Sequence, residues 1–313
     1  MKIKPILIIP GAIDSVFFEI FFKSLKLEKF KSPLILITSY KIIKFQMKKF
    51  KFKKDIKIIK LTNLEHYKLN NKCINIIDVP SQKNSPNSYI KNCFEISFKL
   101  LKKNFTSKLI NGPINKENFL QRKYLGMTEY ISKKFKISKS AMLIYNKEIS
   151  VCPLTTHLPL RLVAKQISKK LIYEKVILIN NFFLNDIGIK PKIAVTGLNP
   201  HCESILKFNE DEKIIRPAII SLKKKGFKID GPFPADTIFL NQNRKNYNVI
   251  LGMYHDQVLS PIKTLKEYDA INITLGLPFY RVSPDHGPNK KMVSKNLSNP
   301  LSLIRSLKFL DKR

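Results

Sequence analysis

Short apolar runs alternate with amphipathic stretches along the first third of the chain. The runs are rich in Ile and Leu and contain few polar residues, which predicts buried strands. Residues 15–25 and 88–103 instead place apolar side chains at helical spacing, with charges on the other side, and predict helices. Strands that alternate with helices are typical of a parallel sheet covered on both faces. The predicted strands are residues 6–9, 34–38, 56–61 and 74–79.

The same alternation continues after residue 116. Residues 160–188 form a long stretch of helical spacing that ends at Gly188, and residues 211–226 form another that ends at Gly226. A chain of 313 residues can form one large domain or two of moderate size. We therefore expect an α/β fold without repeats or low-complexity linkers. The predicted strands of this part are residues 192–198, 248–254 and 269–277.

Histidines stand near the ends of three apolar runs. His157 lies in LTTHLPL, His201 ends AVTGLNPH, and His255 directly follows GMY. The carboxyl ends of strands in an open α/β sheet converge on one crevice, where three imidazoles would suit a divalent transition metal. Against this, no local ligand spacing such as HxxxH is present, and single histidines near strand ends are commonly ordinary hydrogen-bonded residues. The residues alone leave both interpretations open.

Further polar residues lie at the edges of the last two apolar runs. Asp256 follows His255, and Asn272 lies inside the run 269–277, where a buried amide needs a hydrogen-bond partner. Arg281 follows the same run. Such a group of side chains suits a small, charged, oxygen-rich ligand.

The formal charge of +34 raises the question of nucleic-acid binding. The lysines, however, are scattered, with the densest run at residues 48–54, and no nucleic-acid motif or aromatic-interleaved basic patch is present. The chain is rich in Ile, Asn and Phe and has no Trp, as expected from the codons of an AT-rich genome. We therefore expect solvated surface lysines and no nucleic-acid partner.

The cysteines and the amino-terminal segment indicate the cellular compartment of the protein. Cys73, Cys93, Cys152 and Cys202 show no CxxC spacing, which favours free thiols in a reducing cytoplasm. The opening lysines and apolar run resemble a signal peptide, but prolines interrupt the run and no small-residue cleavage site follows. No run approaches the roughly 20 apolar residues of a membrane helix. We expect a cytoplasmic protein without a membrane partner.

A family resemblance appears in the region that holds these polar residues. YHDQ (254–257), Lys263, NITLGLPFYR (272–281) and SPDHG (283–287) closely resemble the C-terminal signature of the 4-hydroxythreonine-4-phosphate dehydrogenases, NAD-dependent enzymes of pyridoxal phosphate biosynthesis. The resemblance covers roughly residues 108 to 310, and the first 105 residues or so match only weakly. Further matching stretches are NGPINK (111–116), GMTEY (126–130), LTTHLPL (154–160), AVTGLNPH (194–201) and GPFPADT (231–237).

The resemblance implies a fold and an assembly. The family's fold is similar to that of isocitrate and isopropylmalate dehydrogenases, with two α/β/α domains and the active site in the cleft between them. Placed on this chain, one domain takes residues 1–120 plus 285–313 and the other takes residues 121–284. The family also implies a homodimer with the active site at the subunit interface.

The resemblance also assigns residues to roles. It implies that His157, His201 and His255 ligate a divalent metal, which would be Zn, Mg or Co. Asp236 and Asp256 would orient imidazoles or transfer protons, with Lys263 as a third catalytic candidate. The sequence has no GxGxxG motif for NAD, and the nearest candidates to contact it are residues 276–288 and the residues near Asn272. The residues implied to bind substrate are Thr128, Lys263, Asn272 and Arg281.

The implied reaction is the oxidation and decarboxylation of 4-phosphooxy-L-threonine to 3-amino-2-oxopropyl phosphate, with NAD as hydride acceptor.

The chain departs from the family at Met127, where the family has a substrate-binding histidine, and at Pro288, where the family has threonine. Two glycine-rich family segments are also replaced. These departures leave two alternatives open: a dehydrogenase of a related phosphorylated hydroxy acid, such as a threonate 4-phosphate, or a non-catalytic, basic polyanion-binding protein on the same fold.

Overall fold

The computed structural model describes residues 3–81, 86–115, 119–120, 123–204, 208–293 and 295–313. The chain forms two compact units. Unit 1 comprises Met1–Gln121 and Pro278–Arg313, and unit 2 comprises Arg122–Leu277.

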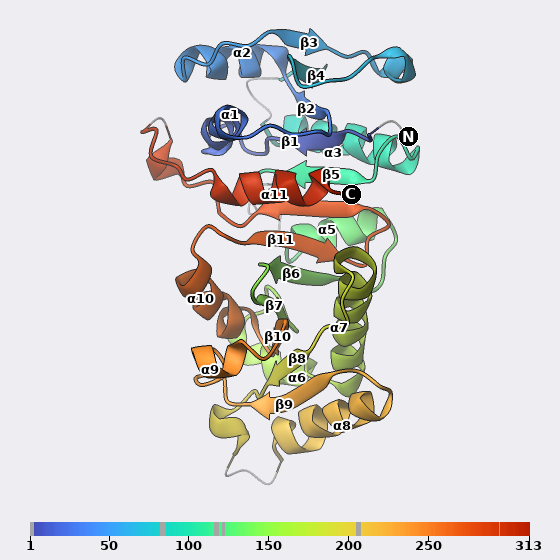
Figure 1. The fold of residues 1–313 in the computed structure, drawn as a ribbon, viewed down its shortest axis with the longest axis vertical. Helices are drawn as coiled ribbons and strands as arrows, with labels where there is room; N and C mark the ends of the chain where they lie inside the picture. Colours follow the sequence, from blue (N-terminus) through green and yellow to red (C-terminus); the bar gives the residue numbers. More distant parts are fainter. Residues whose placement is uncertain (1–2, 82–85, 116–118, 121–122, 205–207, 294) are drawn as a thin grey trace. The chain divides into compact units, whose positions relative to one another are not determined.

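Unit 1 is a parallel sheet with strand order β3-β4-β2-β1-β5-β12 (Figure 1). Both ends of the chain contribute, because β12 pairs with β5 and places Arg281 beside Leu109. The strands are β1 (Ile6–Ile9), β2 (Leu34–Thr38), β3 (Ile56–Ile58), β4 (Ile74–Asp78), β5 (Lys108–Asn111) and β12 (Tyr280–Pro284). The helices are α1 (Phe17–Leu27), α2 (Tyr40–Lys49), α3 (Pro86–Lys102) and α11 (Leu301–Asp311).

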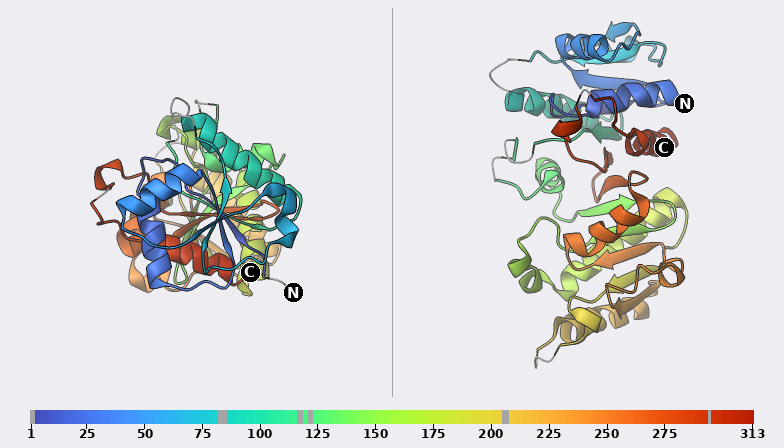
Figure 2. Two further views of the ribbon diagram at one scale, coloured as in Figure 1. Left: turned by 90° about the horizontal axis from the view of Figure 1, so that it is seen from above. Right: turned by 90° about the vertical axis from the view of Figure 1, so that its left-hand side faces the viewer.

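The core of unit 1 lies between this sheet and the helices on its two faces. Every residue of β1 and β2 is buried, as expected for strands covered on both sides. Helix α1 buries one aromatic stripe, in which Phe17 stacks on Phe21 with ring centroids 6.1 Å apart. Figure 2 shows α1 and α11 together on one face and α3 on the opposite face. The predicted parallel, doubly covered sheet is confirmed.

Unit 2 is a mixed sheet with strand order β11-β6-β7-β10-β8-β9. Strand β6 is antiparallel to both of its neighbours, whereas β7, β10, β8 and β9 are parallel to one another. The strands are β6 (Ala141–Tyr145), β7 (Ser150–Pro153), β8 (Ile193–Thr196), β9 (Ile229–Phe233), β10 (Val249–Gly252) and β11 (Ile271–Leu275). The helices are α5 (Met127–Lys134), α6 (Val163–Gln166), α7 (Lys169–Phe182), α8 (Arg216–Lys224), α9 (Asn241–Arg244) and α10 (His255–Lys266).

The core of unit 2 fixes the position of α10. Val258 and Ile262, one turn apart on that helix, pack into a buried cluster with Ile144 of β6, Val151 of β7 and Ile250 of β10. The helix that begins with His255 is therefore attached to the strands whose ends it follows.

The long helix predicted for residues 160–188 is divided. After α6, Ile167 and Ser168 adopt extended backbone, and Ser168 caps α7 by accepting a hydrogen bond from the Leu171 amide (3.3 Å). The last turn is a π-helix that ends at Gly188, whose φ of +83° terminates the helix. The predicted end is confirmed and the continuous helix is wrong, because a serine cap restarts the helix within it.

The compact units place β12 in unit 1, whereas the predicted boundary put residues 278–284 in the second domain. The division into the two domains of the family remains a prediction. Across the described part of the chain, no helix has the length and apolar character needed to cross a membrane. All four cysteines are free thiols.

Candidate functional site

Three neighbouring parallel strands of unit 2 end at one edge of the sheet. β10 lies between β7 and β8, with Gly252 opposite Pro153 and Leu251 opposite Val195. His157 follows β7, His201 follows β8 and His255 follows β10. The structure therefore brings all three histidines to the carboxyl edge of these strands, although they are far apart along the chain.

Two of the three imidazoles approach each other. The ring centroids of His157 and His255 are 5.6 Å apart, with their planes inclined by 40°. Two imidazoles that ligate one ion through bonds of about 2.0–2.1 Å place their ring centroids roughly 5–6 Å apart, so this pair fits a shared cation. Nδ1 of His255 is 2.7 Å from Oδ1 of Asp256, which leaves Nε2 of that ring to act as a ligand.

His201 lies in a tight loop after β8. His201 and Cys202 both have left-handed backbone, with φ of 55° and 62°, which is rare for residues with side chains. Buried Asp211 holds the start of this loop by accepting hydrogen bonds from the amides of Leu198 (2.8 Å) and Asn199 (3.1 Å). The His201 side chain itself is exposed.

A group of three or more His, Cys, Asp or Glu side chains that could hold a metal ion is absent among the residues described. The fit to a metal in one copy of the chain thus rests on the His157 and His255 pair. Metal ligation by the three histidines remains a prediction.

The two predicted carboxylates lie on the exposed side of this edge. Asp256 and Asp236 are both exposed. Burial raises the pKa of the Cys202 thiol, and the negative charges of Asp211 and Asp236 raise it further. Because the charge of Asp236 affects the pKa of Cys202, the Asp236 carboxylate lies near the loop that carries Cys202 and His201.

Thr128 and Asn272 both lie at β11. Oγ1 of Thr128, in the first turn of α5, is 3.4 Å from Oγ1 of Thr274. Asn272 lies two residues before Thr274 and therefore on the same face of the strand. Its Oδ1 is buried and has no hydrogen-bond partner among the described residues, as expected of a group that meets a ligand.

The two basic residues predicted to bind substrate lie in different units. Lys263 is half-buried in α10, two turns after His255. Arg281 belongs to unit 1, is only 3% exposed, and donates from Nε to Oδ1 of Asn111 (2.7 Å). Asn111 ends β5 and opens the stretch NGPINK.

Sequence interpretation assigned no role to three side chains that shape the site. Gln257 ties the strand ends together, since its Oε1 accepts from Thr196 Oγ1 and from the Met253 amide (both 2.7 Å) and its Nε2 donates to the Gly197 carbonyl (2.8 Å). Glu129 and Asp211 are the others. Gln257 and Glu129 lie inside the motifs YHDQ and GMTEY, and these motifs could have identified them. No feature of the sequence distinguishes Asp211.

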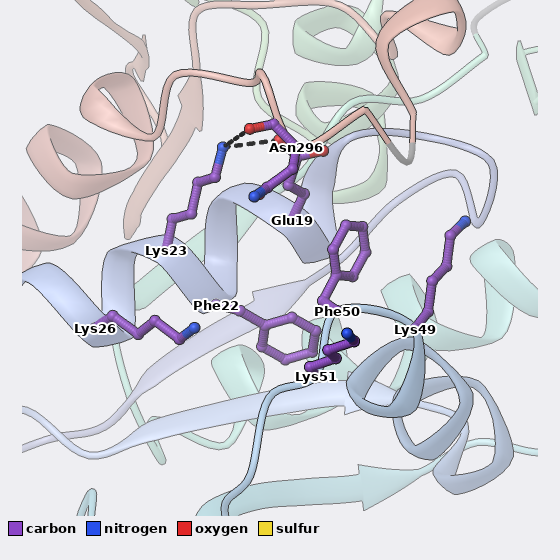
Figure 3. Close-up of a pocket in the computed structure, with 8 residues that line it drawn as sticks. All are labelled: Glu19, Phe22, Lys23, Lys26, Lys49, Phe50, Lys51 and Asn296. Carbon is purple, nitrogen blue, oxygen red and sulfur yellow. Dashed lines mark hydrogen bonds and ion pairs between the residues drawn. The ribbon is translucent and has the colours of Figure 1, made fainter.

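One cavity lies beside Thr128, and another lies in unit 1. The cavity in unit 2, of about 190 Å³, is lined by Thr128, Glu129 and Thr156 among others, and Thr128 is the one predicted substrate residue among the described residues that line it. The other, in unit 1, is about 240 Å³ and is lined by Lys23, Lys26, Lys49 and Lys51 together with Glu19, Phe22, Phe50 and Asn296 (Figure 3). Lys23 is held there by Glu19 Oε1 (3.0 Å) and by the carbonyls of Asn296 and Ser298. None of the residues lining this second cavity belongs to the predicted set.

The chain is similar in sequence to known proteins of one family. The family model described as pyridoxal phosphate biosynthetic protein PdxA matches residues 29–310. The 4-hydroxythreonine-4-phosphate dehydrogenase of Sulfurihydrogenibium sp. (strain YO3AOP1) is 42% identical over 206 residues, which are 64% of this chain and 63% of that protein. The chain therefore matches less than two-thirds of the length of such curated relatives.

Solved structures extend the likeness over nearly the whole chain. A 4-hydroxythreonine-4-phosphate dehydrogenase from Klebsiella pneumoniae has a TM-score of 0.80 at 26% identity and covers 98% of both chains. A beta-decarboxylating dehydrogenase from Thermococcus kodakarensis shares the fold alone, with a TM-score of 0.50 at 13% identity over 97% of this chain and 82% of that one. The expected α/β fold class is confirmed.

Proposed function

Because the chain belongs to the family of the pyridoxal phosphate biosynthetic protein PdxA, we propose that it is an NAD-dependent dehydrogenase of 4-hydroxythreonine-4-phosphate. In the proposed reaction the C3 hydroxyl is oxidised to a ketone, hydride passes to NAD, and the resulting β-keto acid releases CO₂. The products are 3-amino-2-oxopropyl phosphate, CO₂ and NADH. The observation that carries the proposal is the strand edge where His157 and His255 approach to 5.6 Å between ring centroids.

His157, His201 and His255 would hold the divalent metal. Asp256 supports this role, since its carboxylate fixes Nδ1 of His255 and leaves Nε2 for ligation. When bound, such a metal (Zn, Mg or Co) lowers the pKa of a substrate hydroxyl and stabilises negative charge that develops on carbon or oxygen. The proton of the C3 hydroxyl would pass to Asp236, Asp256 or Lys263, the ionisable side chains predicted to act in catalysis.

Substrate capture would use the polar residues around β11 and Arg281. The ammonium of Lys263 and the guanidinium of Arg281 supply charge for a phosphate monoester, and Thr128 supplies a hydroxyl. Asn272 fits this role because the partner of its buried Oδ1 is not found within the described residues.

The family resemblance supports a homodimer with the active site shared between subunits. Two of the three imidazoles approach each other within one copy. A cytoplasmic location accords with four free thiols.

Met127 favours a second candidate function. The residue is 7% exposed at the start of α5, directly before Thr128. A methionine cannot donate a hydrogen bond to a substrate oxygen, whereas the family's histidine can. A related phosphorylated hydroxy acid, such as a threonate 4-phosphate, is therefore the alternative substrate.

Turnover with both compounds tests the proposal. NADH absorbance is followed with 4-phosphooxy-L-threonine or threonate 4-phosphate, each with added Zn²⁺, Mg²⁺ or Co²⁺. We expect NADH with the threonine derivative, loss of activity with EDTA, and kcat/KM of His255→Ala below about one hundredth of wild type. Lys224→Ala, an exposed lysine of α8, should retain wild-type turnover.

The outcomes separate the candidates. Turnover of threonate 4-phosphate alone would assign the alternative substrate. Absence of NADH with either compound and every metal, together with tight, salt-sensitive polynucleotide binding, would replace the enzyme with a polyanion-binding protein.

A further inference from the structure

Each of the two neighbouring imidazoles has a carboxylate near its Nδ1 atom. For His255 the carboxylate is that of Asp256, at 2.7 Å. For His157 it is that of Glu129, on the first turn of α5. A carboxylate hydrogen-bonded at Nδ1 directs the lone pair of Nε2 outward, as Asp256 does for His255.

Gly126 shows how closely Glu129 and His157 approach. A Cβ added to Gly126 would lie 2.5 Å from Nδ1 of His157 and 2.8 Å from Oε2 of Glu129. Both atoms therefore border the small space that the missing side chain leaves. The absence of a side chain at residue 126 lets the imidazole lie against the start of α5, next to the carboxylate.

The carboxylate is held in place from its other side. Thr156 Oγ1 donates a hydrogen bond to Oε1 of Glu129 (2.8 Å), and Thr156 directly precedes His157 in the chain. Oε2 of Glu129 is buried and has no hydrogen-bond partner in the described structure. A buried carboxylate oxygen calls for a donor, and the imidazole beside it can supply one.

We infer that Glu129 is a positioning residue for His157: its Oε2 accepts the Nδ1 proton of the imidazole and leaves Nε2 for the metal. Thr156 and Gly126 make this possible, the first by fixing the carboxylate and the second by leaving room for the ring. The inference rests on the proposed function, because it assigns His157 to the metal site of that reaction.

Metal titration by calorimetry is the first test. Zn²⁺ or Co²⁺ is titrated into the full chain and into Glu129→Ala, Glu129→Gln and Thr156→Val. Loss of a group that orients a ligand typically weakens metal affinity about 10–100-fold, so we expect that loss in Glu129→Ala and a smaller one in Thr156→Val. Glu129→Gln keeps an acceptor oxygen and should fall between Glu129→Ala and wild type.

Glu174→Gln is the matched control. Its carboxylate lines the same cavity but lies 3.8 Å from Lys139 and belongs to α7. We expect wild-type metal affinity from this variant. An affinity of Glu129→Ala within about twofold of wild type would overturn the inference, while metal binding by the wild-type chain would still support the proposed function.

The metal-free protein supplies an independent readout. The ring nitrogens of the five histidines are observed by ¹⁵N NMR, with His157 assigned from its loss in His157→Gln. We expect the Nδ1-protonated tautomer in wild type and a mixture of tautomers in Glu129→Ala, which a purely structural role of Glu129 in α5 would not produce. The same tautomer in both proteins would contradict the inference. Failure of the wild-type chain to bind any metal, with the tautomer still dependent on Glu129, would instead contradict only the metal-dependent function.

Discussion

At the scale of single residues, Gly126 determines where His157 can lie. Its φ of −164° is ordinary extended backbone, so conformational freedom is not the reason for a glycine here. The reason is space, because any Cβ would overlap the His157 ring at 2.5 Å. One missing methyl group thus gives the imidazole its place against α5.

Gly126→Ala should therefore displace His157 and weaken the binding of a divalent metal. The His157 ring is not the flexible end of a long side chain, so the ring or the start of α5 must shift. We expect at least a tenfold loss of Zn²⁺ affinity by calorimetry, the scale expected when a ligand is misoriented.

Gly188→Ala separates this effect from general destabilisation. Gly188 has left-handed backbone (φ +83°), but a Cβ there would meet no atom within 4 Å. That variant should lose about 1 kcal/mol of stability, measured by urea unfolding, and keep its metal affinity. Equal loss of metal affinity in both variants would show that space at Gly126 is not the cause.

At the scale of elements, the site depends on keeping the ends of β7, β8 and β10 aligned. The parallel register sets Gly252 opposite Pro153. Beyond the strands, the side-chain amide of Gln257 connects the segments that follow β8 and β10 through its hydrogen bonds. Gln257 lies in the first turn of α10, so it also joins the helix that carries His255 and Lys263 to strand β8. Every polar atom of its side chain has a protein partner.

Gln257→Leu should damage both stability and activity. Leucine has a similar size but leaves the Thr196 hydroxyl, the Met253 amide and the Gly197 carbonyl without this partner. Each unsatisfied buried group costs about 1–3 kcal/mol, so we expect the free energy of unfolding to fall by at least about 2 kcal/mol. Urea unfolding measures the loss, and NADH formation measures its effect on the site.

Gln242→Leu is the control for this substitution. Gln242 is exposed on α9, and its side chain makes no hydrogen bond to the strands among the described residues. Its replacement should change stability and turnover little. A Gln257→Leu variant as stable and active as Gln242→Leu would refute the role given to the amide.

At the scale of the whole molecule, stability should depend on buried thiols at alkaline pH. Burial raises the pKa of the Cys152 thiol in β7 to about 12, and burial raises the pKa of Cys93 to about 12 as well. The unfolded chain releases these protons near the ordinary thiol pKa of about 8.5, whereas the folded chain retains them. Above that pH the unfolded state binds fewer protons, and folding stability therefore falls.

Cys152→Ala should remove one part of this pH dependence. Between about pH 9 and pH 12 each buried thiol lowers the free energy of unfolding by roughly 1.4 kcal/mol per pH unit. We expect the wild-type slope, measured by urea unfolding at several pH values, to exceed that of Cys152→Ala by this amount. Val151→Ala, which removes buried volume from the same strand, should be less stable but keep the wild-type slope.

The local sequence was enough to predict the alternation of strands and helices, the helix end at Gly188, and the motifs that carry the histidines. These features depend on neighbouring residues: side-chain periodicity, glycine backbone freedom and short spacings. The restart of the helix at Ser168 was missed, because the apolar spacing runs through the cap without interruption.

Contacts between distant segments were decided only in the tertiary structure. His157 and His255 are neighbours because β7 pairs with β10, and strand pairing joins segments that no local pattern relates. Glu129 lies near His157 because both approach the space that Gly126 leaves at the start of α5. The sequence by itself thus determined which chemical groups are present and which elements carry them. Packing decided which of those groups face one another, because burial and hydrogen bonding are satisfied only by the folded chain as a whole.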